Sequence, residues 1–290
     1  MNVAGLRVLV TGASGGIGRA VAAELLRRGA SVLLVGRDSD ALQSAVAGLG
    51  GRSERLDLVA GDLTSEIDRA GVCRSAVAWR GNGINALVNN AGIAGFGAFE
   101  ETSDAQLAAM FAINAVAPMQ LCRALLPHLR QQPAATILNV GSVFGSIGYP
   151  GFAAYSATKF ALRGFTEALR RELADTTVRV QYLAPRATRT AMNPVAVERM
   201  NRVLGVAMDA PERVARAACD MLEQGRRDAV IGWPEKLFVR INALWPRVVD
   251  GSLRKQLPVI RRYASGAGAA AESASAAVLP SRITPQEIAP

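Results

Sequence analysis

The stretch Thr11-Gly12-Ala13-Ser14-Gly15-Gly16-Ile17-Gly18 stands between an apolar run at residues 6–10 and a helical pattern at residues 17–28. Glycines between a strand and a helix allow a tight turn, and they let backbone N–H groups approach a pyrophosphate at the helix N-terminus. Glycine-rich turns also occur without a ligand, but a preceding strand and a following helix favour dinucleotide binding. The stretch therefore predicts a dinucleotide site with contacts at Gly12, Ser14, Gly16, Ile17 and Gly18.

Short apolar runs alternate with longer helical patterns through the first two-thirds of the chain, which is typical of βαβ units. We expect strands at residues 6–10, 31–35, 55–59, 85–89, 135–140, 178–183 and 229–231. We expect helices at residues 17–28, 40–48, 65–79, 104–114 continuing to about 130, 154–174 and 211–223. Because the strands are almost wholly apolar, both of their faces should be buried. The pattern predicts an α/β fold with a doubly wound, Rossmann-type, mostly parallel sheet of about seven strands and helices on both faces.

Composition divides the chain into three parts. Residues 1–232 form the expected α/β domain, and residues 233–263 carry seven basic and two acidic side chains. Residues 264–290 are rich in Ala, Ser, Gly and Pro, so a disordered tail is expected there. In residues 233–263 apolar side chains recur at helical spacing, and Pro246 and Pro258 should interrupt the helix.

Three interpretations of this basic C-terminal helical extension, residues 233–263, stay open. Its apolar face could pack on the domain or on a second subunit. It could lie on an anionic membrane surface, as basic amphipathic helices do. It could also dock an acidic carrier protein or form a lid over a long apolar substrate.

Charge and composition exclude several classes of protein. The 290 residues carry a net charge of +9 and are 50% hydrophobic, which is enough for a core. With no recognised binding motif and 5% aromatic residues, nucleic-acid binding is not expected. One histidine cannot assemble a histidine-rich metal site, so no metal is expected.

Cysteine usage and the N-terminal residues bear on location. Cys73, Cys122 and Cys219 are widely spaced with no CxxC pair, so we expect no disulfide framework and a reducing compartment. There is no run of eighteen apolar residues, and residues 1–5 lead directly into a strand. We therefore expect a cytoplasmic protein without a spanning helix or a secretion signal, peripheral at the inner face of a membrane if the extension binds lipid.

The end of the second expected strand reads Val35-Gly36-Arg37-Asp38. NAD-binding sites usually place a carboxylate at that strand end to bind the ribose 2′-hydroxyl. Here the position is Gly36, and Arg37 could pair bidentately with a 2′-phosphate. The alternative is a surface arginine beside Asp38 as a helix N-cap. We favour NADP(H) as the cofactor.

Four further features follow in order: Asn89-Asn90-Ala91-Gly92, Asn114, Ser142, and Tyr155 with Lys159. Together with the glycine turn they resemble the short-chain dehydrogenase/reductase (SDR) family over about residues 6–232. The resemblance implies that Tyr155 exchanges a proton with the substrate and that Ser142 orients the carbonyl. It implies that Lys159 contacts the nicotinamide ribose, and that Asn114 holds a water that relays protons to Lys159.

The spacing of Tyr155 and Lys159 supports this pairing, since residues four apart share one helix face. An adjacent ammonium and a positive nicotinamide ring would favour the phenolate. The resemblance also implies that Asp62 contacts the adenine. The further cofactor contacts that the resemblance implies are Leu63, Asn90, Ala91, Gly92, Tyr155, Lys159, Pro185, Thr188 and Thr190.

One departure from the family is Pro185-Arg186, where the family has Pro-Gly. A Cβ can obstruct a turn that glycine permits close to the cofactor. Arg186 and Arg189 could then face an anionic substrate, the cofactor phosphates or solvent.

The resemblance implies an oxidoreductase that transfers hydride between NADP(H) and a carbonyl or secondary alcohol. We expect a ketone reductase for a hydrophobic or acyl-chain, 3-oxoacyl-like substrate, with its pocket near Ser142, Tyr155 and residues 187–204. The alternative is a cofactor-binding regulatory or scaffold protein with little turnover. The resemblance further implies a homo-oligomer, a dimer or tetramer, formed through the helices that carry Asn114 and Tyr155.

Overall fold

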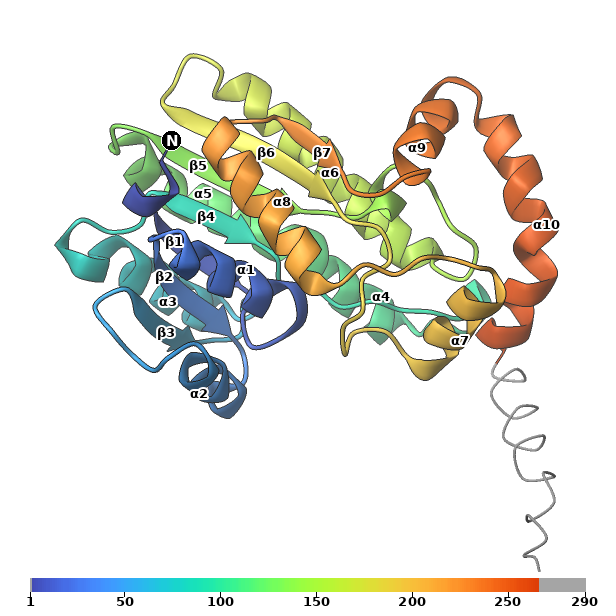
Figure 1. Cartoon of the computed structure of the whole chain (residues 1–290), viewed down its shortest axis with the longest axis horizontal. Helices are drawn as coiled ribbons and strands as arrows, with labels where there is room; N and C mark the ends of the chain where they lie inside the picture. Colours follow the sequence, from blue (N-terminus) through green and yellow to red (C-terminus); the bar gives the residue numbers. More distant parts are fainter. Residues whose placement is uncertain (1, 266–290) are drawn as a thin grey trace, which may run out of the picture.

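Seven parallel strands form the centre of the protein, as the apolar runs predict (Figure 1). The computed structural model describes residues 2–265. The strands lie in the order β3-β2-β1-β4-β5-β6-β7. They are β1 (Arg7–Thr11), β2 (Ser31–Gly36), β3 (Leu56–Ala60), β4 (Ala86–Asn89), β5 (Ala135–Val140), β6 (Val178–Ala184) and β7 (Asp228–Val230). The strand order reverses between β1 and β4, so the crevice at their carboxyl ends is where such folds bind ligands.

Helices cover both faces of the sheet. One face is packed by α1 (Gly16–Arg27), α2 (Ser39–Gly48) and α8 (Pro211–Gln224). The other is packed by α3 (Glu66–Ala78), α5 (Ala117–Arg130) and α6 (Ala153–Glu172). The predicted doubly wound fold is therefore confirmed, with element ends shifted by one or two residues.

A long helical run carries Asn114, as predicted. It consists of α4 (Asp104–Phe111), a π-helical turn (Ala112–Val116) and α5. The run is long and apolar enough to cross a membrane by length and composition, with a mean hydropathy of 1.4. Leu121, Leu125 and Leu129 on it are fully buried against the sheet, however. Burial of each such leucine stabilises the fold by about 2 kcal/mol. Buried core helices are often as long and as apolar as membrane-spanning ones, so length and composition alone are weak evidence for a membrane span.

One helix was not foreseen from the sequence. α7 (Val195–Val203) lies in the segment expected to border the substrate, and it buries Val197, Met200 and Asn201. Short helical turns occur at Val3–Gly5, Trp79–Gly81, Phe99–Glu101 and Val143–Gly145.

The extension folds as α9 (Glu235–Leu244) and α10 (Pro246–Ala264), which lie beyond the carboxyl ends of the strands (Figure 1). Pro246 begins a new helix, as expected. The expectation for Pro258 is wrong, because Pro258 lies inside α10. Proline removes one backbone hydrogen bond from a helix, but burial of Ile260 and Tyr263 just beyond it anchors this turn to the domain.

The extension packs on the domain, which is the first of the three interpretations. Val249 is buried beside Val143 and Ile147. Asn242 Nδ2 donates to the Ser146 carbonyl at 2.9 Å. The part of the expected tail from residue 266 onward lies outside the described residues.

All three cysteines are free, as their spacing predicted, and all three are buried. Burial raises the pKa of Cys122 and of Cys219 to about 12, so neither is a reactive thiolate at neutral pH. Within residues 2–265 no three His, Cys, Asp or Glu side chains are arranged to hold a metal ion.

Candidate active site

The glycine turn lies at the carboxyl end of β1 and leads into α1. Gly15, the N-cap of α1, offers no side-chain hydrogen bond, and the first turn of the helix contains no acidic residue. A Cβ on Gly18 would collide with the Gly12 carbonyl oxygen, and one on Gly12 would lie 2.8 Å from Ala91 Cα. This cradle leaves the N–H groups of α1 available to a phosphate, as a dinucleotide requires.

Asn90, just after β4, holds the glycine turn in place. Its Nδ2 donates to the carbonyl oxygens of Thr11, at 3.0 Å, and Gly12, at 3.3 Å. Thr11 Oγ1 accepts from the backbone N–H groups of Asn90 at 2.9 Å and Ala91 at 3.0 Å. The strand that follows the switch point and the glycine turn are therefore joined directly.

The residues expected at the adenine end follow β2 and β3. Arg37 is exposed and Leu63 is buried. Asp62 accepts hydrogen bonds from the Thr64 N–H at 2.9 Å and the Thr64 hydroxyl at 2.8 Å. These bonds, with a smaller contribution from Arg37, hold the Asp62 pKa below its usual value. Ser14, Ala91 and Gly92 are partly buried.

Tyr155 and Lys159 share one face of α6, as their spacing predicts. Lys159 Nζ lies 5.7 Å from the centre of the Tyr155 ring and donates to the Val140 carbonyl at 3.2 Å. Burial raises the pKa of Tyr155 to about 12, against a lowering hydrogen bond from Ser142. Burial lowers the pKa of Lys159 to about 8. In the protein alone, therefore, Tyr155 holds its proton and does not form the phenolate.

Asn114 is fully buried in the π-helical turn. Its Nδ2 donates to the Ile93 carbonyl at 2.8 Å and to Thr158 Oγ1 at 3.0 Å, and its Oδ1 accepts from the Ile93 N–H at 2.8 Å. A Cβ on Gly92 would lie 2.9 Å from Asn114 Oδ1 and 3.8 Å from Lys159 Nζ. The structure thus brings Asn114, Gly92 and Lys159 together, while the proton relay remains a prediction.

Ser142 and Tyr155 open into a pocket of about 430 Å³. Ile17, Pro185, Thr188 and Thr190 also line it, so the glycine turn and the segment after β6 border the same space. A Cβ on Gly16 would lie 3.1 Å from Thr190 Cγ2, which shows how closely they approach.

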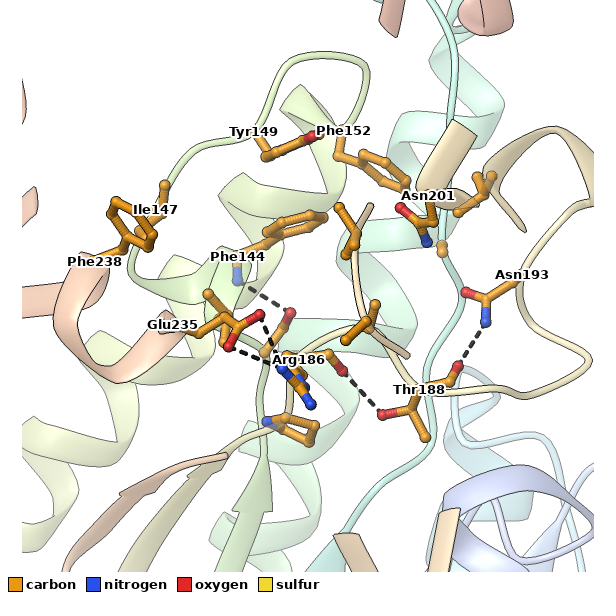
Figure 2. A pocket seen from close by; sticks show the side chains of 18 of the residues that line it. Phe144, Ile147, Tyr149, Phe152, Arg186, Thr188, Asn193, Asn201, Glu235 and Phe238 are labelled. Atoms are coloured by element: carbon orange, nitrogen blue, oxygen red, sulfur yellow. Dashed lines mark hydrogen bonds and ion pairs between the residues drawn. The ribbon is translucent and has the colours of Figure 1, made fainter. Parts of the chain in front are cut away.

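Aromatic side chains make up one wall of this pocket (Figure 2). Phe144 stacks on Tyr149 with ring centres 4.8 Å apart, and Phe152 lies 5.2 Å from Phe144 and 6.2 Å from Tyr155. Tyr149 Oη donates to Gln256 Oε1 of α10 at 2.9 Å. The extension contributes Phe238, Val249 and Leu253 to the lining.

Arg186 lines the pocket but is not solvated, and its guanidinium is already paired with two carboxylates. Its Nε and Nη2 donate to the Asp209 carboxylate at 3.1 and 2.9 Å. Its Nη1 donates to Glu235 Oε2 at 3.2 Å, as Figure 2 shows. Its side chain is 11% exposed. Arg189, in contrast, is exposed and donates to the Met208 carbonyl at 3.0 Å.

Sequence reasoning missed the aromatic wall. Phe144, Tyr149, Phe152 and Tyr155 are four of the fifteen aromatic residues in the chain, gathered within residues 144–155. That local density was a usable signal. The contribution of α7 was expected, because residues 187–204 were placed at the pocket, whereas the side chains of α10 that reach it depend on how distant helices pack.

Residues 7–201 match the short chain dehydrogenase family. The chain is 30% identical over 272 residues to the oxidoreductase SadH of Mycobacterium tuberculosis, covering 86% of this chain and 96% of that one. A short-chain dehydrogenase structure from Burkholderia cenocepacia in complex with NADP is 27% identical, with a TM-score of 0.73 and coverage of 87% and 99%. A Burkholderia phymatum SDR structure in complex with NAD is 23% identical, with a TM-score of 0.76 and coverage of 86% and 96%, and shows the same fold.

The chain therefore belongs to the short-chain dehydrogenase/reductase family, and the resemblance seen in its motifs is confirmed. It is an oxidoreductase of the class that uses a nicotinamide nucleotide, and the glycine cradle fits such a group.

Proposed function

We propose that this protein is an NADP(H)-dependent ketone reductase for uncharged hydrophobic or acyl-chain substrates, including 3-oxoacyl thioesters. One observation carries the proposal: Ser142 and Tyr155 open into an aromatic pocket whose arginine is already neutralised by two carboxylates. An oxidoreductase site of this character suits an apolar carbonyl compound.

The charge balance of the pocket supports an uncharged substrate. Among its described lining residues, Arg186 and Glu235 are the charged ones, and they are paired with each other. Arg186 is paired with Asp209 as well. A substrate carboxylate would lose its hydration here without gaining a free cation, which is unfavourable.

The side chains also suit carbonyl reduction. The bound nucleotide would supply hydride to the carbonyl carbon. Tyr155 would donate its phenolic proton to the carbonyl oxygen, and Ser142 would hydrogen-bond that oxygen as negative charge develops. With its pKa raised to about 12, Tyr155 is protonated at neutral pH and is ready to donate. Lys159, beside the ring, would stabilise the phenolate that remains.

The end of β2 supports NADP(H) over NAD(H). A Cβ on Gly36 would lie 3.2 Å from two Leu42 side-chain carbons, so a carboxylate there would have to displace α2 packing. Arg37 is exposed next to it and close enough to Asp62 to lower its pKa. A guanidinium at this place can pair with a 2′-phosphate.

A substrate and cofactor panel tests the proposal. Initial rates with NADPH and NADH would be measured on hydrophobic ketones, 3-oxoacyl thioesters and short 2-oxo acids. We expect the largest kcat/KM for the apolar compounds with NADPH. A preference for the charged 2-oxo acids would overturn the substrate proposal, and a preference for NADH would overturn the cofactor proposal.

Arg37→Ala isolates the cofactor question. The variant should lower kcat/KM for NADPH tenfold or more, since hydrogen bonds to charged groups contribute about 2 kcal/mol. The rate with NADH should not fall. Arg130→Ala, at an exposed arginine in the last turn of α5, is the matched control and should leave both rates unchanged.

We also propose a cytoplasmic homo-oligomer, a dimer or tetramer. Val116 lies on the helical run that bears Asn114, and Phe160 lies on α6. Each of these two side chains is 43% exposed, and Phe99, before α4, is 58% exposed. Apolar side chains that gather on neighbouring helices often mark subunit contacts. Light scattering of Val116→Ser and Phe160→Ser variants checks this, with a fall in mass expected.

A further inference from the structure

The outward face of α9 carries apolar and basic side chains together. Leu237 and Leu244 are seven residues apart, and Lys236 and Arg240 are four apart, so the four occupy adjacent positions on the helix. All four are exposed. Leu237 is 42% exposed and Leu244 is 68% exposed.

The same character continues around the corner between α9 and α10. Trp245 and Val248 are 64% and 61% exposed, and Arg247 between them is exposed as well. The two helices lie at one end of the molecule, beyond the carboxyl ends of the strands (Figure 1). Single exposed apolar residues are ordinary, but a contiguous group of them marks an interaction site.

This exposed group is continuous with the mouth of the substrate pocket. Trp233 and Phe238 line the pocket, yet they are 70% and 38% exposed. Residues 233–248 therefore contribute side chains both to the exterior and to the lining of the pocket that contains Tyr155.

The exposed charges of this stretch are basic and favour an anionic partner. Glu235 is its one acidic residue, and it is paired with Arg186. Lys236, Arg240 and Arg247 are exposed around the apolar side chains. Basic side chains that surround tryptophan and leucine are typical of surfaces that lie in the headgroup region of an anionic bilayer.

We propose that the exposed side chains of residues 233–248, here called the docking surface, bind the surface of an anionic membrane and turn the pocket mouth toward it. Trp233, Leu244, Trp245 and Val248 enter the headgroup boundary, and the basic side chains contact anionic lipid. An apolar substrate dissolved in the bilayer could then reach the pocket without crossing water. The docking does not depend on catalysis, so it can be tested separately from the proposed function.

Flotation of the full chain with phosphatidylcholine vesicles, with and without phosphatidylserine, is the direct test. We expect flotation with the anionic vesicles and little with the neutral ones. A combined Leu244→Ser, Trp245→Ser and Val248→Ser variant should remain in the unbound fraction. Ile67→Ser, at an 81% exposed isoleucine on α3, is the matched control and should float like the native chain.

Charge reversal separates local attraction from net charge. A combined Lys236→Glu, Arg240→Glu and Arg247→Glu variant should lower the partition coefficient about a hundredfold or more, from about fivefold for each basic side chain near the surface. Reversal of Arg74, Arg130 and Arg216, three exposed arginines outside the extension, changes the net charge equally. That control should retain binding, and equal loss in both variants would overturn the proposal.

Tryptophan fluorescence gives a second readout. The chain has three tryptophans, Trp79, Trp233 and Trp245. A blue shift on addition of anionic vesicles should persist in Trp79→Phe and vanish when Trp233 and Trp245 are both replaced by Phe. No vesicle binding by the native chain would overturn the proposal. If, in that case, the mass of the protein in solution halves in the combined Leu244, Trp245 and Val248 variant, the docking surface joins two copies of the chain. If the native chain binds an acidic carrier protein instead, the docking surface belongs to that partner.

Discussion

Arg186 and Asp209 form a bidentate ion pair, with hydrogen bonds of 3.1 and 2.9 Å between two polar groups that lie 23 positions apart in the chain. Their side chains are 11% and 4% exposed. The pair joins the segment after β6 to the start of α8. The same guanidinium also donates to Glu235, which is the first residue of α9. A residue that departs from the family pattern thus holds the extension against the pocket.

Asp209→Asn should lower the free energy of unfolding by about 2 kcal/mol, because a largely buried guanidinium loses one of its two carboxylates and keeps Glu235. Chemical denaturation at neutral pH measures this. Asp220→Asn is the control, since Asp220 is 45% exposed and its ion pair with Arg28 should contribute less than about 1 kcal/mol. Equal effects of the two substitutions would contradict the assignment.

The same pair gives the effect a pH dependence. Burial raises the Asp209 pKa, but the hydrogen bonds and charges of Arg186 and Arg213 outweigh burial and hold it below its usual value. Its stabilisation is therefore complete above the pKa of the unfolded carboxyl, 3.8, and is lost as the pH falls through the folded pKa. The difference between the native chain and Asp209→Asn should shrink in acid.

Tyr155→Phe should lower carbonyl reduction at least about a hundredfold, the usual contribution of a general acid. Nucleotide binding, followed by fluorescence titration, should be almost unchanged. Tyr149→Phe removes another pocket hydroxyl, the donor to Gln256, and should retain most activity. Turnover at the native rate by Tyr155→Phe would show that another group donates the proton.

Lys159→Met should alter how the stability of the nucleotide-free protein depends on pH. Burial lowers the Lys159 pKa from 10.5 to about 8, so below pH 8 the folded state bears the cost of a buried charge. Between pH 8 and 10.5 the unfolded state binds more protons than the folded state. As the pH is raised through this range, the free energy of unfolding of the native chain should therefore rise relative to that of the variant by about 3 kcal/mol. Denaturation curves at intervals across this range test it, and parallel pH profiles would contradict it.

Gly18→Ala should abolish nucleotide binding or the fold around it, because the added Cβ would collide with the Gly12 carbonyl. Alanine normally stabilises a helix relative to glycine by about 1 kcal/mol. A loss of stability or of nucleotide binding in Gly18→Ala would therefore point to the collision rather than to helix propensity. Gly15→Ala is the matched control: its φ is −166°, and no atom lies within 4 Å of the added Cβ. Thermal unfolding with and without nucleotide compares the two.

The sequence predicted the strands and helices of the sheet well, because the signals that place them are local. Apolar runs, helix caps and the glycine turn operate over a few residues, so β5 and the Pro211 start of α8 were placed at the observed positions. The four-residue spacing of Tyr155 and Lys159 put them on one face of α6. The predicted ends of the elements were less accurate, and the short helix α7 was not predicted, because tertiary packing decides both.

The chemistry of individual side chains was less predictable. Adjacent charges would favour a phenolate at Tyr155 when the nicotinamide is bound, whereas in the protein alone burial of the hydroxyl raises the pKa of Tyr155 to about 12. Burial depends on Phe144 and Phe152 and on helices far along the chain. The aromatic density of residues 144–155 reports part of that environment, and the contribution of the distant helices has no local signal.

By itself, the sequence determined the order of strands and helices along the chain and the glycine turn, because local periodicity and spacing encode them. Its resemblance to the family pointed to Ser142, Tyr155 and Lys159. Only the tertiary structure decided that Arg186 is paired with Asp209 and Glu235, that α10 continues through Pro258, and that the extension forms a wall of the pocket. Those features rest on contacts between segments 23 to 107 positions apart, and their partners are chosen by packing.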